Sequence, residues 1–218
     1  METENGGILA QKGLKYTTYE GAYYNGLNIK IGWKQRAKND QYYQIYNYPI
    51  YGVGIYSSTF NTDILGSPFA VYGFVQTPIN PKENSRWSYD YRIGLGLSAN
   101  FKPYNENENP LNLVIGSKNN VFIDLGIRAQ YELNPHWKAG VGLAFHHFSN
   151  GALRLPNKGV NLVPLTVSVN YQLNPDLKIK RDSVLKPFSK KILYHINYGA
   201  GFKQLKDYSD ERFFKTTI

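Results

Sequence analysis

The side chains of this chain that could perform chemistry together are concentrated in residues 146–161, whose sequence is HHFSNGALRLPNKGVN. His147 and Ser149 lie at i and i+2 there, and Asn161 closes the segment. A serine hydroxyl becomes an effective nucleophile when a neighbouring imidazole accepts its proton during attack. An amide can hold the imidazole in the required tautomer, as Asn does in Cys-His-Asn proteases. We therefore predict acyl transfer with Ser149 as nucleophile, His147 as base and Asn161 orienting the imidazole.

Acyl transfer also needs hydrogen-bond donors for the oxyanion of the tetrahedral intermediate. We expect these donors from the side chain of Asn150 and from backbone N–H groups around Gly151 and Ala152, because glycine allows a close approach of the chain. Asn157, in the same segment, is expected to support them. A His-x-Ser pair is common on protein surfaces, so this interpretation depends on the elements that position the residues.

Alternation of apolar and polar residues with a period of two recurs from about Gly26 onward and predicts an all-β chain. The clearest stretch is 121–133, with an oily set at odd positions and polar or charged residues at most even ones. The other predicted strands are 27–33, 51–57, 69–76, 87–101, 137–149, 161–173 and 192–202, with a weaker Tyr-rich candidate at 14–24.

A soluble β-sandwich would show similar alternation, but two features favour a membrane barrel. Strand lengths match the roughly ten tilted residues that cross a bilayer, and the polar face mixes Gly with opposite charges, as in a narrow lumen. The 19 Tyr, 11 Phe and 3 Trp also suit aromatic girdles. No apolar run approaches the roughly 18 residues of a spanning helix. We predict an antiparallel transmembrane β-barrel of about eight strands.

The connections orient this barrel, because bacterial barrels have short periplasmic turns and longer outer loops. Asn134 and Pro135 form a tight turn, so the loop 150–160 is expected on the outer side. An even number of strands must then precede Trp137, which requires the weak candidate at 14–24 to be a strand.

This arrangement places the candidate site on the lipid-facing surface. His147 and Ser149 have the same phase as the apolar odd positions of their strand, and Asn161 has the outward phase of the next strand. Polar groups facing lipid cost free energy and are retained mainly for function. His146 should point into the lumen. Further lumen ion pairs are expected among Asp90, Arg92, Asp124, Arg128 and Glu132.

Composition bounds the remaining properties of the chain. The formal charge of +9 favours an anionic partner, and the absence of cysteine excludes disulfides, thiolate metal sites and cysteine nucleophiles. No basic run is interleaved with stacking aromatics, so lipid phosphates explain the charge better than nucleic acid does. The start METENGG lacks signal-peptide features, and we expect that a signal peptide was removed. We divide the chain into a flexible N-terminus (1–13), the barrel (14–173) and a basic extension or extra hairpin with an additional strand (174–218).

The sequence also resembles a known family. HFSNG followed by PNKG, with the upstream segments YPIYGVGIY, LGSPFAVYGF, YRIGLGLSANF and IGSKNN, is similar to the outer-membrane lipid A deacylases, or acyloxyacyl hydrolases, over residues 48–173. The resemblance implies a small outer-membrane barrel that removes the ester-linked 3-hydroxyacyl chain at position 3 of lipid A in lipopolysaccharide, without a metal or cofactor. It places the catalytic pair on His147 and Ser149, and a conserved Asn-small pair on Asn150 and Gly151.

One residue departs from that family, whose best-known triad has a glutamate where this chain has Asn161. A neutral amide can orient His147 but cannot stabilise its charged form as a carboxylate would. The outer-membrane phospholipases A share HxSNG and an Asn at this spacing, in a larger, calcium-dependent and dimeric barrel. A phospholipase A acting on outer-membrane lipids is therefore the alternative enzyme, and a catalytically silent lipid-binding barrel is the alternative outside enzymes.

Overall fold

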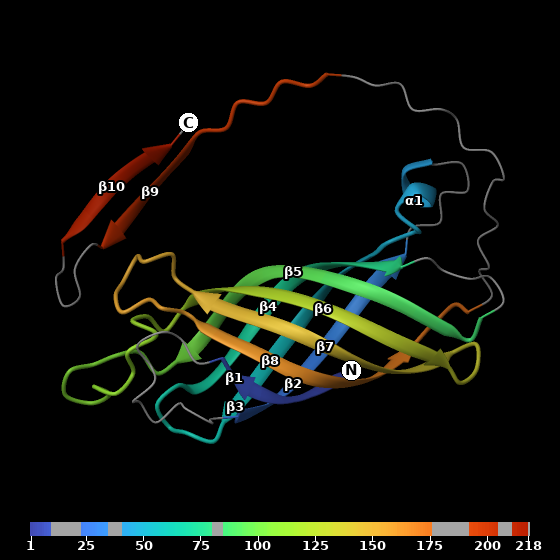
Figure 1. The fold of residues 1–218 in the computed structure, drawn as a ribbon, viewed down its shortest axis with the longest axis horizontal. Helices are drawn as coiled ribbons and strands as arrows, with labels where there is room; N and C mark the ends of the chain where they lie inside the picture. Colours follow the sequence, from blue (N-terminus) through green and yellow to red (C-terminus); the bar gives the residue numbers. More distant parts are fainter. Residues whose placement is uncertain (10–22, 35–40, 80–84, 176–191, 205–210, 218) are drawn as a thin grey trace.

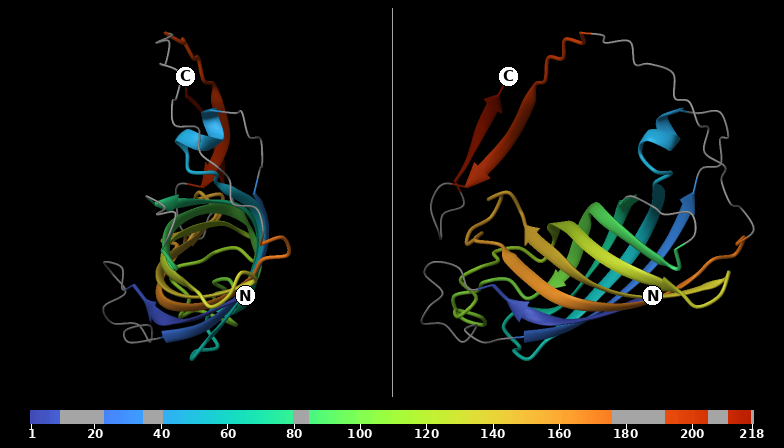
Figure 2. Two further views of the ribbon diagram at one scale, coloured as in Figure 1. Left: turned by 90° about the vertical axis from the view of Figure 1, so that its right-hand side faces the viewer. Right: turned by 45° about the vertical axis from the view of Figure 1, so that its right-hand side comes forward.

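The computed structural model describes residues 1–9, 23–34, 41–79, 85–175, 192–204 and 211–217. Eight antiparallel strands form a closed barrel in chain order, in which β1 completes the ring by pairing with β8 (Figure 1). These strands are β1 (Glu2–Ile8), β2 (Tyr23–Lys34), β3 (Ile50–Phe60), β4 (Gly66–Ile79), β5 (Trp87–Phe101), β6 (Asn120–Glu132), β7 (Trp137–Ser149) and β8 (Val160–Tyr171). The predicted fold class is therefore confirmed, and the ring is visible along its axis in Figure 2.

Two further elements lie outside the ring. A short helix, α1 (Gln41–Ile45), lies between β2 and β3 at the end of the barrel opposite the β7–β8 loop. β9 (Gly199–Gln204) and β10 (Arg212–Thr217) form a separate two-stranded sheet, so the strand predicted at 192–202 begins only at Gly199. The described part of the chain contains no helix with the length and apolar character of a membrane span.

Alternating side chains divide each strand between two environments. On β5, Ile93, Leu95 and Leu97 are exposed on the outer surface, whereas Asp90 and Arg92 are buried in the lumen. A barrel immersed in lipid satisfies both sets, because the bilayer covers the apolar face and the closed ring satisfies the backbone hydrogen bonds.

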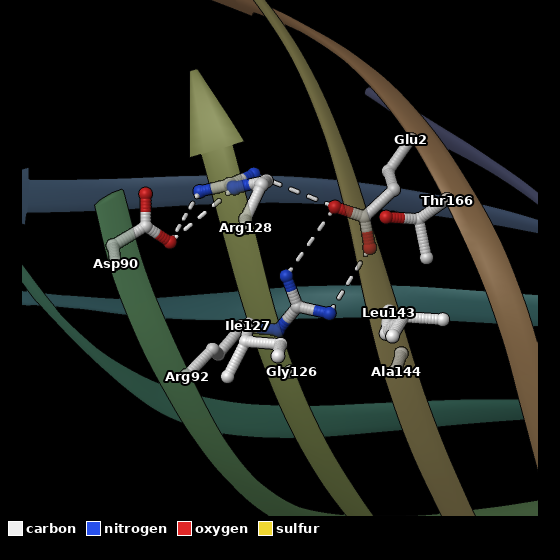
Figure 3. A pocket seen from close by; sticks show the side chains of 9 residues that line it. All are labelled: Glu2, Asp90, Arg92, Gly126, Ile127, Arg128, Leu143, Ala144 and Thr166. Carbon is white, nitrogen blue, oxygen red and sulfur yellow. Dashed lines mark hydrogen bonds and ion pairs between the residues drawn. The ribbon is translucent and has the colours of Figure 1, made fainter. Parts of the chain in front are cut away.

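The charged side chains of the lumen neutralise one another (Figure 3). Arg92 lies 2.5 Å from Asp124 and 3.0 Å from Glu2, and Arg128 lies 3.2 Å from Asp90. The predicted ion pairs are therefore present among these four residues of β5 and β6. Glu132 differs, because it lies at the end of β6, half-exposed, 3.9 Å from Lys138.

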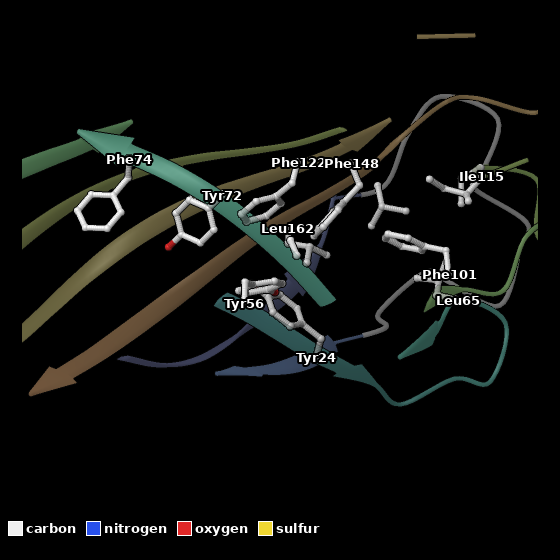
Figure 4. Close-up of a cluster of buried hydrophobic side chains, with 13 residues drawn as sticks. Tyr24, Tyr56, Leu65, Tyr72, Phe74, Phe101, Ile115, Phe122, Phe148 and Leu162 are labelled. Atoms are coloured by element: carbon white, nitrogen blue, oxygen red, sulfur yellow. The ribbon is translucent and has the colours of Figure 1, made fainter. Parts of the chain in front are cut away.

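Aromatic side chains fill the half of the lumen nearer the β7–β8 loop (Figure 4). The rings of Phe122 and Phe148 have centroids 4.9 Å apart, and Tyr56 stacks on Phe122 at 5.2 Å. The other members of this buried cluster include Tyr24, Leu65, Tyr72, Phe74, Phe101, Ile115 and Leu162. The barrel therefore has a packed interior and resembles a core more than a pore.

The first strand corrects the predicted division of the chain. The segment 1–13 was expected to be a flexible N-terminus, with the first strand at 14–24, but Glu2–Ile8 is β1. The glycine-rich sequence ETENGGI carries no apolar face, since Glu2 and Glu4 point into the lumen. Gly6 is needed for the close pairing with β8, because a Cβ there would lie 2.4 Å from the Cα of Pro164. Residues 14–22 lie outside the described residues, and Tyr23 begins β2.

The buried ion network should be important for stability. Replacing Arg92→Ala would leave Asp124 and Glu2 buried without their main partner, and we expect a loss of about 3–5 kcal/mol in the free energy of unfolding. Lys138→Ala removes a partly exposed partner of Glu132, 3.9 Å away, and should cost less than about 1 kcal/mol. Urea titrations of both variants folded into lipid vesicles measure the difference, and equal unfolding midpoints would contradict this account.

Candidate active site

Strand β7 carries the candidate catalytic residues on its outward face. His147 and Ser149 continue the row of Val141 and Leu143, which are exposed, while His146, the residue directly before His147, is buried in the lumen. The register of β7 against β8 sets His147 directly opposite Asn161. All three residues are therefore at the end of the barrel that carries the β7–β8 loop, on the outward-facing surface.

The three side chains form a continuous hydrogen-bonded chain. His147 Nδ1 lies 2.6 Å from Asn161 Oδ1, and His147 Nε2 lies 3.0 Å from Ser149 Oγ. An amide oxygen can only accept, so Nδ1 carries the proton and Nε2 has a free lone pair. The Ser149 hydroxyl can then donate to Nε2. This is the geometry that general-base activation of a serine requires.

The loop after Ser149 is held by Asn150. Its amide nitrogen donates to Ser117 Oγ at 2.7 Å and to the backbone oxygen of Arg154 at 2.8 Å. Both amide protons are thus used within the loop region, so the structure does not leave the Asn150 side chain as an obvious oxyanion donor. The backbone N–H of Asn150 donates to Asn157 Oδ1 at 3.0 Å, which connects two of the expected supporting residues.

The next two residues turn the backbone sharply. Gly151 and Ala152 have φ values of +64° and +63°. Within the described residues, neither of their backbone N–H groups has a hydrogen-bond partner, and the amide NH₂ of Asn157 has none either. These donors lie in the β7–β8 loop that begins directly after Ser149.

An apolar groove of about 350 Å³ runs along the outward surface near the hydrogen-bonded chain. Its walls come from alternate residues of β5, β6 and β7: Tyr91, Ile93, Leu125, Ile127, Leu143 and Phe145. Phe145 lies two residues before His147 on the same face of β7. The groove therefore lies on the same outward surface as the imidazole, beside the part of β7 that precedes His147.

Comparison with known proteins identifies the family. Residues 27–170 match the family model of the lipid A 3-O-deacylases (PagL). The chain belongs to the lipid A 3-O-deacylase family. A solved structure described as the crystal structure of the outer membrane enzyme PagL has 16% sequence identity and a TM-score of 0.49, covering 76% of this chain and 95% of that one. No curated protein matches the chain.

Membership confirms the resemblance, the ester-hydrolase class and the bacterial outer-membrane location that the sequence indicated. It also identifies lipid A, the lipid part of lipopolysaccharide, as the substrate of this deacylase. The matched segment contains β3 to β7 entirely and most of β2 and β8, and so includes every residue of the candidate site.

Two residues that contact the site were not singled out from the sequence. Gly159 approaches the imidazole so closely that a Cβ there would lie 2.8 Å from His147 Cε1. Ser117 accepts the hydrogen bond from Asn150. In the sequence, Gly159 is the last residue of PNKG and Ser117 is the third residue of IGSKNN. Both motifs indicated the family resemblance but gave no role to either residue.

The hydrogen bond that His147 Nδ1–H donates to Asn161 Oδ1 should determine the tautomer of His147. In wild-type deacylase at a pH where this ring is neutral, ¹⁵N NMR should show His147 protonated at Nδ1. Asn161→Leu removes the acceptor, so the signal should move toward a mixture of tautomers. His136, which contacts the backbone oxygen of Gln172 at 2.9 Å, is the internal control and should not change. An unaltered His147 signal in the variant would refute this assignment.

Proposed function

We propose that this deacylase removes the ester-linked 3-hydroxyacyl chain of lipid A by nucleophilic catalysis, with Ser149 as nucleophile, His147 as general base and Asn161 as the orienting residue. The observation that carries the proposal is the hydrogen-bonded chain of these three side chains on the lipid-facing surface. The family supplies the substrate, and this geometry supplies a mechanism for it.

The reaction would proceed in two steps. Ser149 Oγ attacks the ester carbonyl while its proton passes to His147 Nε2, which forms a tetrahedral intermediate. Collapse breaks the bond to the sugar oxygen, and His147 returns the proton to that oxygen, leaving an acyl-Ser149. Water then repeats the sequence, with His147 first accepting its proton and then protonating Ser149 Oγ, so that the fatty acid is released and the enzyme is restored.

The oxyanion would be stabilised from the β7–β8 loop. The proposed donors are the backbone N–H groups of Gly151 and Ala152 and the amide NH₂ of Asn157, none of which has a hydrogen-bond partner among the described residues. Asn150 supports them by fixing the loop through Ser117 and Arg154. Donors already oriented toward the developing charge stabilise the transition state without a reorganisation cost.

Asn161 gives this site a neutral partner for the imidazole. A carboxylate would stabilise imidazolium more strongly, but it would also place a charge next to hydrocarbon, where desolvation is costly. The amide keeps the orienting hydrogen bond at 2.6 Å without that charge. We infer that orientation of His147, more than stabilisation of its charged form, is the contribution of Asn161.

The apolar groove would hold the acyl chain that is removed. It lies on the outward surface, farther along the barrel wall than His147. Its walls are outward-facing apolar side chains, and Gly126, Ala144 and Arg92 line it between them. A lipid whose sugar lies at the membrane surface would place its acyl chain in this direction. The substrate can therefore reach Ser149 without leaving the membrane.

Replacing the nucleophile tests the proposal. Ser149→Ala should lower the rate of lipid A deacylation by about 10³-fold or more, because the attacking atom is lost. Ser168→Ala is the matched control, since Ser168 lies buried in the lumen on β8. Mass spectrometry of lipid extracts from membranes carrying each protein measures the products.

The same extracts separate the alternatives. Loss of one hydroxyacyl chain from lipid A in the wild type and the control, but not in Ser149→Ala, supports the proposal. Lysophospholipid that forms only when calcium is added would indicate a phospholipase A. Identical lipids in the presence and absence of wild-type protein would indicate a silent barrel, and full activity of Ser149→Ala would reject the mechanism.

The groove should determine acyl-chain length. Leu143→Trp fills the space between β6 and β7, so turnover of lipid A with a long 3-O-acyl chain should fall more than turnover with a short one, by about tenfold in the ratio of kcat/KM. Ile55→Trp makes the same kind of change at an exposed position on β3, outside the groove, and should leave the ratio unchanged. If Leu143→Trp and Ile55→Trp changed the ratio of kcat/KM for long and short acyl chains equally, the groove would not be the acyl-binding site.

A further inference from the structure

The loop that carries the proposed oxyanion donors is held by a second loop of the barrel. Residues 102–119 connect β5 to β6, and residues 150–159 connect β7 to β8. Ile115 forms an isolated bridge with Asn157. The backbone N–H groups of Lys158 and Gly159 both donate to the oxygen of Val114, at 3.0 and 3.2 Å. The final residues of the β7–β8 loop are therefore fixed to the β5–β6 loop by backbone contacts.

The backbones of the two loops are in direct contact at Gly116 and Leu155. A Cβ on Gly116 would lie 2.5 Å from the backbone oxygen of Leu155, so only glycine permits this approach. The adjacent Ser117 accepts the 2.7 Å hydrogen bond from Asn150. Backbone contacts of this kind cannot be relieved by rotating a side chain, so the position of one loop determines that of the other.

Gly159, which is hydrogen-bonded to the β5–β6 loop, also packs against the imidazole of His147. It is buried, its φ is +76°, and a Cβ on it would lie 2.8 Å from His147 Cε1 and 3.0 Å from the backbone oxygen of Phe148. Cε1 is the ring atom between the two nitrogens, which are held by Asn161 and Ser149. The backbone at Gly159 therefore limits movement of the ring on the side that neither hydrogen bond covers.

We propose that Gly159 is a positioning residue for catalysis, held against the His147 ring by the β5–β6 loop. The inference rests on the proposed catalytic role of His147. Hydrogen bonds to a neutral amide are weaker than those to a carboxylate, so Asn161 alone orients the ring less firmly than an acid would. The steric contact from Gly159 supplies a second constraint that does not depend on charge.

The experiment compares two Gly→Ala variants that carry the same backbone strain. Gly66, at the start of β4, also has a φ of +76°, and its added Cβ would meet Asn100 and Lys102 at 3.1 Å, with no contact to His147. Gly159→Ala should lower kcat on lipid A by about 10²-fold, because a small misplacement of a catalytic group has that effect. KM should change little, and Gly66→Ala should keep the wild-type kcat.

A second measurement distinguishes positioning of the ring from general damage. The rate at which a serine-directed sulfonyl fluoride labels Ser149 depends on activation by His147, so it should fall in Gly159→Ala in parallel with kcat and stay unchanged in Gly66→Ala. Both rates are expressed per folded molecule, with folding measured by the heat-dependent mobility shift of the barrel on gels. Equal kcat and equal labelling in the two variants would overturn the proposal.

Gly116→Ala keeps the test decisive if Gly159→Ala does not fold. It separates the loops at their closest approach without touching His147, so it should lower kcat and labelling in the same direction. Wild-type rates in Gly116→Ala would overturn the clamping role of the β5–β6 loop. The underlying mechanism is tested separately by Ser149→Ala. If this variant kept the wild-type deacylation rate, the roles of Ser149 and His147 would be rejected whatever the glycine variants show.

Discussion

Side-chain alternation along β7 is the constraint on which the candidate site depends. A shift of one residue would exchange His146 and His147 between the lumen and the lipid face. The interior opposes such a shift, because His146 Nε2 lies 2.8 Å from Glu4 and Phe148 packs against Phe122. The burial of His146 and Phe148 on the lumen face of β7 thus determines that His147 and Ser149 lie on the outward face.

The site also shows how polar chemistry is tolerated next to hydrocarbon. Each polar atom of the His147 ring has a partner, and the orienting residue is an uncharged amide. Neighbouring positions on the same face, such as Leu143 and Val141, remain apolar. On β7, the outward polar side chains are therefore confined to the end of the strand, where the barrel wall meets the β7–β8 loop.

The sequence predicts what depends on local alternation and misses what depends on contacts between loops. Strands β5 to β8 were predictable because one face of each is apolar, and the outward phase of His147 and Asn161 follows from the same pattern. β1 was missed because its outward face is polar and its inward face carries Glu2 and Glu4, which find partners only in the folded barrel. The internal hydrogen bonds of Asn150 were likewise unpredictable, because Ser117 is distant in sequence.

The packed interior has a consequence for traffic across the outer membrane. Tyr56, Phe122 and Phe148 occupy the lumen at one level, and Arg92 with its carboxylate partners occupies it at another. Neither lipid nor fatty acid can pass along the barrel axis. Substrate and products must then exchange laterally with the leaflet in which the protein sits, so a cell could carry many copies of this enzyme without loss of its permeability barrier.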